Sequence, residues 1–372
     1  MSTLNVEAIS HPTSGSNATI NGITPAGTNQ LGNRNLIING AMQVAQRGTS
    51  FTPATEFGYT LDRYVTFSTN TGSANLTQET SSPPEGHTTY ARITSTGAAS
   101  VTGRNLFSQI VEGQNLAPTK WGYSDAKDVT ISFWVRSSLT GDFGFAVNDT
   151  NQNPCIVMKY NIASANTWEH KTLLIPATTS GDFGLTSSGR GCWLFWDLGT
   201  SSTHEYGTTD TWVDSNTKYT PTNVQQLITV SGATLDITGV QLEVGTVATP
   251  FERRSYGQEL ALCQRYYETC YQQGLAPGSS TSQNNILAVC PGNINRGYGH
   301  LQFQVKKRAS ATVTFYSTSG APGKFRNATQ GTDITMSAAC SFGDSGISYE
   351  TSVGIVGVTD KLQGLYTAEA EL

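Results

Sequence analysis

Short runs of β-branched and aromatic residues, divided by turn-forming residues, limit the folds open to this chain. In the clearest run, VTISFWVRSS at Val129–Ser138, Ile131, Phe133 and Val135 point one way and the residues between them point the other. This period of two is typical of a strand with one buried face. Comparable runs, separated by Gly, Asp and Asn clusters, are CIVMKYNI, KTLLIPAT, CWLFWDLG, VQQLITVS and TLDITGVQLEVG. The pattern predicts a mostly β protein with a two-sheet sandwich of jelly-roll type.

The composition agrees with a β-rich, loop-rich protein and excludes some partners. Only 13% of the 372 residues are charged, 38 are glycine, and Ser, Thr and Asn are abundant. The net charge is −5 and no basic stripe is present, so we expect no nucleic-acid partner. No apolar run is long enough to span a bilayer, and MSTLNVEAIS lacks the basic and apolar regions of a secretory signal. We therefore expect synthesis in a cytoplasm and no membrane insertion.

The chain divides into four parts. Residues 1–35 are polar and turn-rich, and only LNVEAI and ATINGI could pair as strands, so this extended segment needs a partner to fold or else is a disordered tail. Residues 36–254 are predicted to form the sandwich, 255–273 a short linking helix, and 274–372 a C-terminal β-sandwich domain. The ending LQGLYTAEAEL predicts a final strand built into a sheet.

The linking segment SYGQELALCQRYYETCYQQG differs from the rest of the chain because it carries helical signals. Ser255 is a suitable N-cap, and Gln258, three residues later, can complete a capping box. Gly274 and Pro277 are predicted to end the helix.

The linking helix would carry an apolar stripe with spacings of four, three, four and three residues. Its members are Tyr256, Leu260, Cys263, Tyr267 and Cys270. This a/d pattern is about two heptads long, which is too short to hold a coiled coil alone. It fits a small junction among three copies of the chain. It fits equally a helix packed on its own sandwich, for which Leu262 and Tyr266 lie off the stripe, and periodicity does not decide between the two.

The cysteine and carboxylate patterns predict neither a metal site nor a catalytic centre. The six cysteines form no CxxC and no Cys/His cluster has zinc spacing, so we expect small buried hydrophobes and no cofactor. NDTNQN at Asn148–Asn153 has several oxygen ligands but lacks the EF-hand order, which favours a hairpin turn over a calcium site.

Catalytic motifs of the GxSxG, HExxH and P-loop types are missing from the sequence. Asp142, Asp149, Asp182 and Asp197 lie near loops, where a glycosidase pair is possible in principle. Loop aspartates beside glycines are ordinarily turn residues. We therefore expect a protein that is not an enzyme.

Aromatic residues in polar, Gly-rich loops make glycan binding the better-supported chemistry. Aromatic faces stack on sugar rings, while Asn, Asp, Gln and Ser bind the hydroxyl groups. In GCWLFWDLG, alternation separates Trp193 and Phe195 from Leu194 and Trp196, so at least one tryptophan is expected in the core. The surface candidates are Tyr206, Trp212, Tyr298, His300, Phe325, Arg326 and Tyr349.

Two long motifs give the chain a family resemblance. One pairs NLIINGAMQVAQRG at Asn35–Gly48 with LDRY at Leu61–Tyr64, and the other is ITGVQLEVGTVATPFERRSYGQELALCQRYY at Ile237–Tyr267. Together they resemble a tail-fibre or virion structural module of tailed bacteriophages, including cyanophages and phages of marine bacteria. FQVKKRASATVTFYSTSG and YTAEAEL are similar to the C-terminal module of that family, and MSTLNVEAISHPTSG to its short attachment segments. KKRASAT lacks the proline that the family has there.

This resemblance implies a homotrimeric virion protein with jelly-roll-like domains. It places the N-terminus, with Leu4, Val6 and Ile9, on other tail proteins of the particle, and the distal β domain against a host-surface glycan. Two alternatives are a purely structural virion component, such as a short fibre, connector or head fibre, and an enzyme that degrades capsular polysaccharide.

Overall fold

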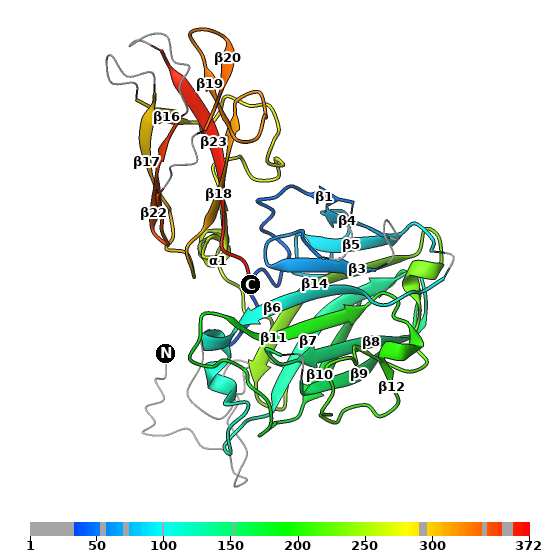
Figure 1. Ribbon diagram of the computed structural model, residues 1–372. Helices are drawn as coiled ribbons and strands as arrows, with labels where there is room; N and C mark the ends of the chain where they lie inside the picture. Colours follow the sequence, from blue (N-terminus) through cyan, green and yellow to red (C-terminus); the bar gives the residue numbers. More distant parts are fainter. Residues whose placement is uncertain are drawn as a thin grey trace, which may run out of the picture.

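The computed structural model describes residues 33–52, 57–69, 74–98, 100–151, 153–289, 296–336, 341–351 and 360–372. The predicted attachment residues Leu4, Val6 and Ile9 lie outside this part of the chain. Strands dominate the described residues, which confirms the mostly β fold, and they form a large sandwich and a smaller C-terminal β body (Figure 1). Among the described helices, none has the length and apolar character that crossing a membrane requires.

The larger body is a β-sandwich whose two antiparallel sheets each contain six described strands. One sheet runs β1 (Ser50–Phe51), β4 (Ala74–Glu79), β5 (Tyr90–Ser95), β14 (Thr234–Val244), β7 (Val129–Ser137), β10 (Glu169–Ile175). The other runs β2 (Gly58–Tyr59), β3 (Tyr64–Ser68), β6 (Asn105–Glu112), β11 (Arg190–Asp197), β8 (Gly141–Asn148), β9 (Cys155–Ile162). The chain repeatedly crosses between sheets, as from β6 to β7 and from β7 to β8, which gives the predicted jelly-roll-like topology.

The connections of the sandwich carry short elements of their own. They are the 3-10 helices η1 (Gly113–Thr119), η2 (Ser202–His204) and η3 (Leu227–Thr229), and the parallel pair β12 (Glu205–Tyr206) and β13 (Thr220–Pro221). Long loops of this kind place side chains at the ends and outer faces of a rigid sandwich.

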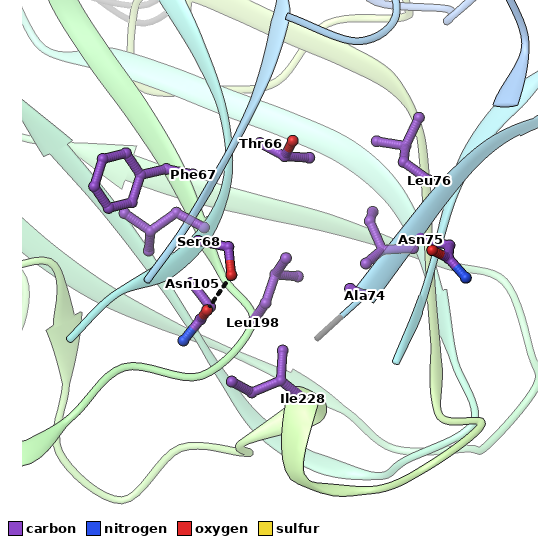
Figure 2. Close-up of a pocket in the computed structure, with 11 residues that line it drawn as sticks. Thr66, Phe67, Ser68, Ala74, Asn75, Leu76, Asn105, Leu198 and Ile228 are labelled. Atoms are coloured by element: carbon purple, nitrogen blue, oxygen red, sulfur yellow. Dashed lines mark hydrogen bonds between the residues drawn. The ribbon is translucent and has the colours of Figure 1, made fainter. Parts of the chain in front are cut away.

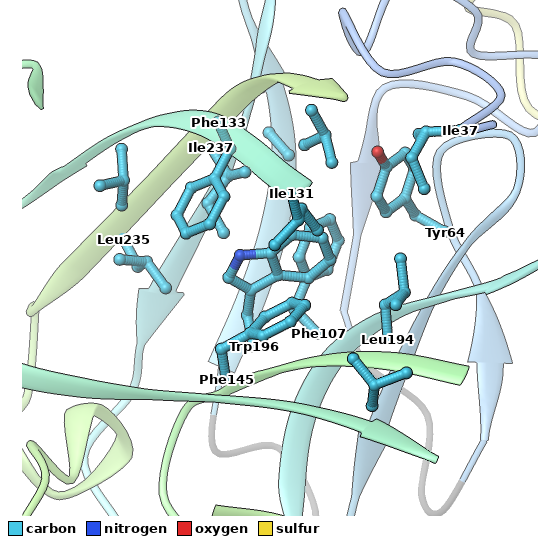
Figure 3. Packing of buried hydrophobic residues seen from close by; sticks show 14 of the residues in the cluster. Ile37, Tyr64, Phe107, Ile131, Phe133, Phe145, Leu194, Trp196, Leu235 and Ile237 are labelled. Atoms are coloured by element: carbon cyan, nitrogen blue, oxygen red, sulfur yellow. The ribbon is translucent and has the colours of Figure 1, made fainter. Parts of the chain in front are cut away.

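Large apolar side chains fill the space between the two sheets (Figure 3). Trp196 of β11 packs edge-on against Phe133 of β7 and Phe145 of β8, with ring centroids 5.6 and 5.2 Å away. The predicted inward residues of β7, which also include Ile131 and Val135, are fully buried. This confirms the alternation predicted for the strand, and each such side chain contributes about 1.5–3 kcal/mol by its burial.

The C-terminal body contains two sheets, coloured from yellow to red in Figure 1. The first places β23 (Leu362–Glu369) between β15 (Tyr267–Thr269), β16 (Ile286–Ala288), β18 (Thr312–Ser317) and β19 (Lys324–Asn327), and β19 also pairs with β20 (Thr332–Thr335). The second runs β17 (Tyr298–Gln302), β22 (Gly346–Glu350), β21 (Ser341–Phe342). The predicted final strand is therefore confirmed, and it is the central one of its sheet.

The linking helix is shorter than the sequence predicts. It is α1 (Tyr256–Gln264), and its N-terminus has the predicted capping box between Ser255 and Gln258. The chain then enters β15, where Tyr267 pairs with Glu369 of β23. The prediction of a helix to residue 273 is wrong, because Tyr-Tyr-Glu-Thr suits a strand and pairing with β23 satisfies its backbone groups.

The predicted stripe faces its own chain. Cys263 is buried against Ile38 and Val44, and Tyr267, which belongs to β15, is also buried. These two residues cannot meet sister chains, so the predicted trimer junction through them is wrong. Leu260 is partly buried on the same cluster, Cys270 accepts the Tyr366 backbone N–H at 3.2 Å, and Tyr256 is 43% exposed. The homotrimer itself stays a prediction.

A buried ion cluster joins the two bodies near the C-terminus. Glu371, whose side chain is 4% exposed, forms ion pairs with Arg63 and, at 3.2 Å, with Arg47. Each guanidinium also lies over a tyrosine ring: Arg63 is 3.6 Å from the Tyr266 centroid and Arg47 is 3.5 Å from that of Tyr267. The cations belong to the sandwich, while Glu371 follows β23, so the cluster fixes the position of one body on the other.

Two further ion pairs have buried carboxylates: one joins the segment after α1 to the sandwich, and the other lies within the C-terminal body. Arg265, just after α1, donates to the fully buried Glu112 of β6 at 2.7 and 3.0 Å. Lys307 and Glu268 are both fully buried and their charged atoms are 2.7 Å apart. Glu268 also accepts from the Tyr366 hydroxyl at 2.7 Å. Removing one member of such a set leaves a buried charge without its partner.

We expect Glu371→Gln to destabilise the protein by about 3–5 kcal/mol, because the buried Arg63 would lose its ion-pair partner and Arg47 would be left with a 3.8 Å pair to the half-exposed Glu369. Urea unfolding of the full chain measures this change. Asp125→Asn is the matched control, since Asp125 pairs with Lys120 on the surface and its loss should leave the midpoint unchanged. Equal midpoints for Glu371→Gln and the wild type would contradict the proposed importance of the cluster.

Because Asp197 of β11 is buried, we expect the stability of the folded protein to depend on pH. Burial raises the pKa of this carboxyl from 3.8 to about 6, although Thr200, Thr220 and the Gly199 amide donate to it. Because the folded form then binds the proton more tightly, the ionised group costs stability above pH 6 and this cost disappears as the pH falls toward 4. The free energy of unfolding of Asp197→Asn should lack this component, which is at most about 3 kcal/mol. If the free energy of unfolding changes with pH in the same way for the variant and the wild type, the prediction is contradicted.

Candidate functional site

Two loops of the sandwich enclose a pocket of about 230 Å³. One loop follows η1, and the other connects β10 to β11. We call this site the aromatic pocket, and its lining residues are Trp121, Gly122, Tyr123, Gly181, Asp182, Phe183, Gly184 and Leu185. Both loops are anchored on strands at their ends, which holds the site on a rigid scaffold.

Glycines bring the two loops close together. Gly122 and Gly181 both have positive φ, of 86° and 95°. A Cβ atom on Gly122 would lie 2.8 Å from the Gly181 carbonyl oxygen, and one on Gly181 would lie 2.4 Å from Pro154 Cδ. The Gly122 N–H donates to the Thr178 carbonyl at 2.9 Å. Larger residues would push the loops apart, so the pocket requires glycine at both positions.

Three packed aromatic rings support the floor of the pocket. Trp121 and Phe183 are buried with centroids 5.1 Å apart, and Trp212 packs edge-on against them at 5.6 and 5.8 Å. The Trp212 indole donates to the Pro176 carbonyl at 2.7 Å. Trp212 was predicted to face a receptor directly, but it is half-buried and holds the floor in place.

Tyr123 and Asp182 lie at the mouth. Tyr123 is 58% exposed, so its ring is accessible to a ligand. Asp182 is also exposed, and its carboxylate accepts the Gly184 N–H at 2.9 Å, which orients the side chain. An exposed ring beside an oriented carboxylate can stack on a sugar and accept hydrogen bonds from its hydroxyls.

The NDTNQN segment braces the aromatic pocket from behind. Asp149 accepts the N–H groups of Asn151 at 2.8 Å, Asn153 at 2.7 Å and Asp182 at 3.0 Å, and burial raises its pKa. The segment connects β8 to β9, which confirms the predicted hairpin turn. Of the four aspartates considered for a glycosidase pair, Asp149 and Asp182 are neighbours, whereas Asp142 accepts from Asn161 at 2.9 Å and Asp197 is buried elsewhere.

The described cysteines follow the prediction of buried free thiols. Cys155, Cys192 and Cys263 are buried and Cys270 is partly buried, while Cys290 and Cys340 lie outside the described residues. Within the described ranges, no group of three or more His, Cys, Asp or Glu side chains could hold a metal ion.

Some of the predicted glycan-binding residues of the C-terminal body are buried and others are exposed. Phe325 and Tyr349 are buried in its core, so their prediction as receptor-facing residues is wrong. Both belong to strands, β19 and β22, whose alternation turns them inward. Arg326 is half-buried and pairs with Asp333 at 3.1 Å. Tyr298 and His300 lie exposed on the same face of β17, as predicted for surface residues.

The aromatic residues of β11 and its following loop are mostly covered. Trp196 belongs to the main core, which confirms that at least one tryptophan is inside. Trp193 and Phe195 face outward, but loop residues cover them, and Tyr206 packs partly buried on the same cluster. Tyr123 and Trp121 are not among the candidates predicted from the sequence. Both flank a glycine in WGYSD, which is the same pattern that selected the other candidates.

A second hollow lies between the sheets beside β3 and β4 (Figure 2). Its volume is about 10 Å³, which is room for about one water molecule and not for a sugar. At its wall the Ser68 hydroxyl donates to Asn105 Oδ1 at 2.6 Å. The aromatic pocket is therefore the better candidate for ligand binding.

No protein-family model and no curated protein sequence matches this chain. Similar solved structures include the enzymatically active domain of bacteriophage CBA120 tailspike protein 4, at 12% identity and TM-score 0.32, covering 56% of this chain and 21% of that chain. A CBM4 structure has 12% identity and TM-score 0.30, covering 55% of this chain and 97% of that chain. A family 30 carbohydrate-binding module has 12% identity and TM-score 0.30, covering 61% and 97%. At these values the likeness carries no argument about function.

We expect Gly122→Ala to destabilise the protein by about 1–3 kcal/mol and to open the aromatic pocket, because its Cβ would meet the Gly181 carbonyl. Gly232→Ala is the matched control: Gly232 also has a positive φ, of 76°, but its Cβ would meet nothing within 4 Å. Thermal unfolding compares the two. A cost for Gly122→Ala no larger than that for Gly232→Ala would show that the loops do not need this close approach.

Proposed function

We propose that the protein is a bacteriophage tail-fibre protein that binds a glycan of the host surface, with the aromatic pocket as a contact site. The observation that carries this proposal is the pairing of the exposed Tyr123 ring with the exposed Asp182 carboxylate at the mouth of the pocket. The apolar face of a sugar ring would stack on Tyr123, and its hydroxyls would donate to Asp182.

The dimensions of the pocket favour one ring of a longer glycan. Its volume of about 230 Å³ is below the ~300–1,000 Å³ of sites that enclose a drug-sized ligand. The rest of the glycan would then remain outside, on the surface of the sandwich. The buried Trp121 and Phe183 and the half-buried Trp212 hold the pocket in its shape before binding, which lowers the entropy cost of association.

The chemistry of the pocket supports binding without hydrolysis. Asp182 offers an exposed carboxylate, whereas its neighbour Asp149 accepts two N–H groups of its own turn with one oxygen and the Asp182 N–H with the other. A glycosidase of the usual kind needs two carboxyl groups across the scissile bond. Release of reducing ends from host polysaccharide would overturn this part of the proposal.

The tail-fibre role rests on the sequence resemblance. It includes attachment to other tail proteins through Leu4, Val6 and Ile9, a place in the virion, and a homotrimer. Three copies would present three weak sites to one cell, and such avidity raises the apparent affinity by orders of magnitude. Light scattering that shows a monomer at micromolar concentration would remove the trimer from the proposal.

We expect Tyr123→Ala and Asp182→Asn each to lower the affinity for host-surface glycan about tenfold, which is about 1.4 kcal/mol. Binding of the purified full chain to host cells and to extracted surface polysaccharide measures this. Leu287→Ala, which shortens an exposed side chain of β16 outside the pocket, is the matched control and should bind as the wild type. Unchanged binding by both pocket variants would exclude the pocket, and a wild type that binds neither cells nor polysaccharide would favour a purely structural virion role.

A further inference from the structure

A row of charged side chains crosses the outer face of the sheet that contains β7 and β10. Asp236 of β14 stands opposite Arg92 of β5 and opposite Arg136 of β7. Arg92 donates to both carboxylate oxygens at 2.8 Å, and Arg136 donates from Nε at 2.8 Å. This triad is rigid, because Asp236 is buried and its carboxylate holds both arginine side chains in place.

Trp168 stands at the end of this row, just before β10. The Arg136 guanidinium lies 4.6 Å from its ring centroid, and Tyr90 packs edge-on against it at 5.2 Å. Its indole N–H donates to the Ser82 carbonyl at 2.9 Å. Trp168 is only partly buried, so three contacts hold a ring that remains accessible. Such a ring loses little entropy when a ligand stacks on it.

The next residues of β10 continue this surface. His170, Thr172 and Leu174 are exposed, and the residues between them are less so, which places the three on the outer face. Trp134 of β7 stands opposite His170, with ring centroids 5.2 Å apart. Among the described strands β10 pairs with β7 alone, so this surface lies at the edge of its sheet. We call Trp134, Trp168, His170, Thr172 and Leu174 the β10 strip.

Most charges around the β10 strip are paired. Arg92 and Arg136 face Asp236, and Glu79 is close enough to Arg92 to interact with it. Lys171 pairs with Glu169 at 2.5 Å. A surface with aromatic rings, a hydroxyl and an imidazole, in which most nearby charges are paired, suits a neutral polar ligand that also has apolar faces.

We propose that the β10 strip is a second saccharide-binding surface and that its ligand is an extended neutral glycan chain. From Trp168 to Leu174 a strand spans ~20 Å, which is long enough for several sugar rings in a row. One ring would stack on Trp168, and His170 and Thr172 would bind hydroxyls of the following units. The inference rests on the proposed saccharide binding but not on the aromatic pocket, which is lined by different residues although one of its loops begins where β10 ends.

The test is affinity electrophoresis of the full chain in gels that contain a soluble neutral polysaccharide: a mannan, a galactan, a xylan or a β-glucan. We expect at least one polymer to retard the wild type, and Trp168→Ala to lose about tenfold in affinity while Trp168→Phe keeps most of it. Thr172 is exposed, so Thr172→Arg should fold normally. Its long side chain should block the path of the glycan and lower the affinity by a similar factor. Leu287→Ala, at an exposed position of β16 in the C-terminal body, is the control and should migrate as the wild type.

The outcomes separate the two sites. A loss of polysaccharide affinity in the Trp168→Ala and Thr172→Arg variants supports the β10 strip, whatever the affinity of Tyr123→Ala. Retardation that only Tyr123→Ala abolishes would overturn the strip and leave the aromatic pocket as the single site. A wild type that no neutral polymer retards would overturn the strip, while binding to host-surface polysaccharide through Tyr123 would still uphold the proposed function. Retardation that disappears with added salt would contradict the neutral ligand.

Discussion

The ion cluster of Glu371 with Arg47 and Arg63 is the interaction on which the arrangement of the two bodies depends. Burying three charges is costly unless each has a partner, and here both arginines also stack on tyrosine rings of the junction. An apolar contact would tolerate sliding, whereas this cluster accepts one geometry. The C-terminal body therefore stands on the sandwich in a defined position, and the C-terminus lies between them (Figure 1).

The motifs that resemble phage fibre modules meet at this junction. The Asn39 N–H donates to Glu259 at 2.5 Å, and Gln46 donates to Asp62 at 2.6 and 2.7 Å and to the Tyr267 carbonyl at 2.8 Å. These residues come from the opening segment, from LDRY and from the stretch around α1. Their role in this structure is to join the two bodies, so the resemblance reports on architecture, and ligand chemistry has to be sought on other surfaces.

Both proposed binding surfaces belong to the sandwich. The aromatic pocket is made by loops, and the β10 strip lies on an edge strand whose inner face is part of the core. The C-terminal body keeps only Tyr298 and His300 of its predicted candidates on an exposed face, because Phe325 and Tyr349 complete its interior. A small β body has few large side chains for its core, so its aromatic residues are needed inside.

The sequence by itself determined the features that depend on neighbouring residues. The alternation in Val129–Ser138, the core position of at least one of Trp193 and Trp196, the capping box of Ser255 and the hairpin turn at Asp149 were all predictable, because strand period, N-caps and turns are local. Tertiary structure decided the rest. Tyr267 lies in a strand and not in the helix, because it pairs with β23, which is far along the chain. Tyr123 and Asp182 lie in one site, because glycines allow two distant loops to come into contact. Such contacts join residues too far apart in the chain for any period or propensity to register them.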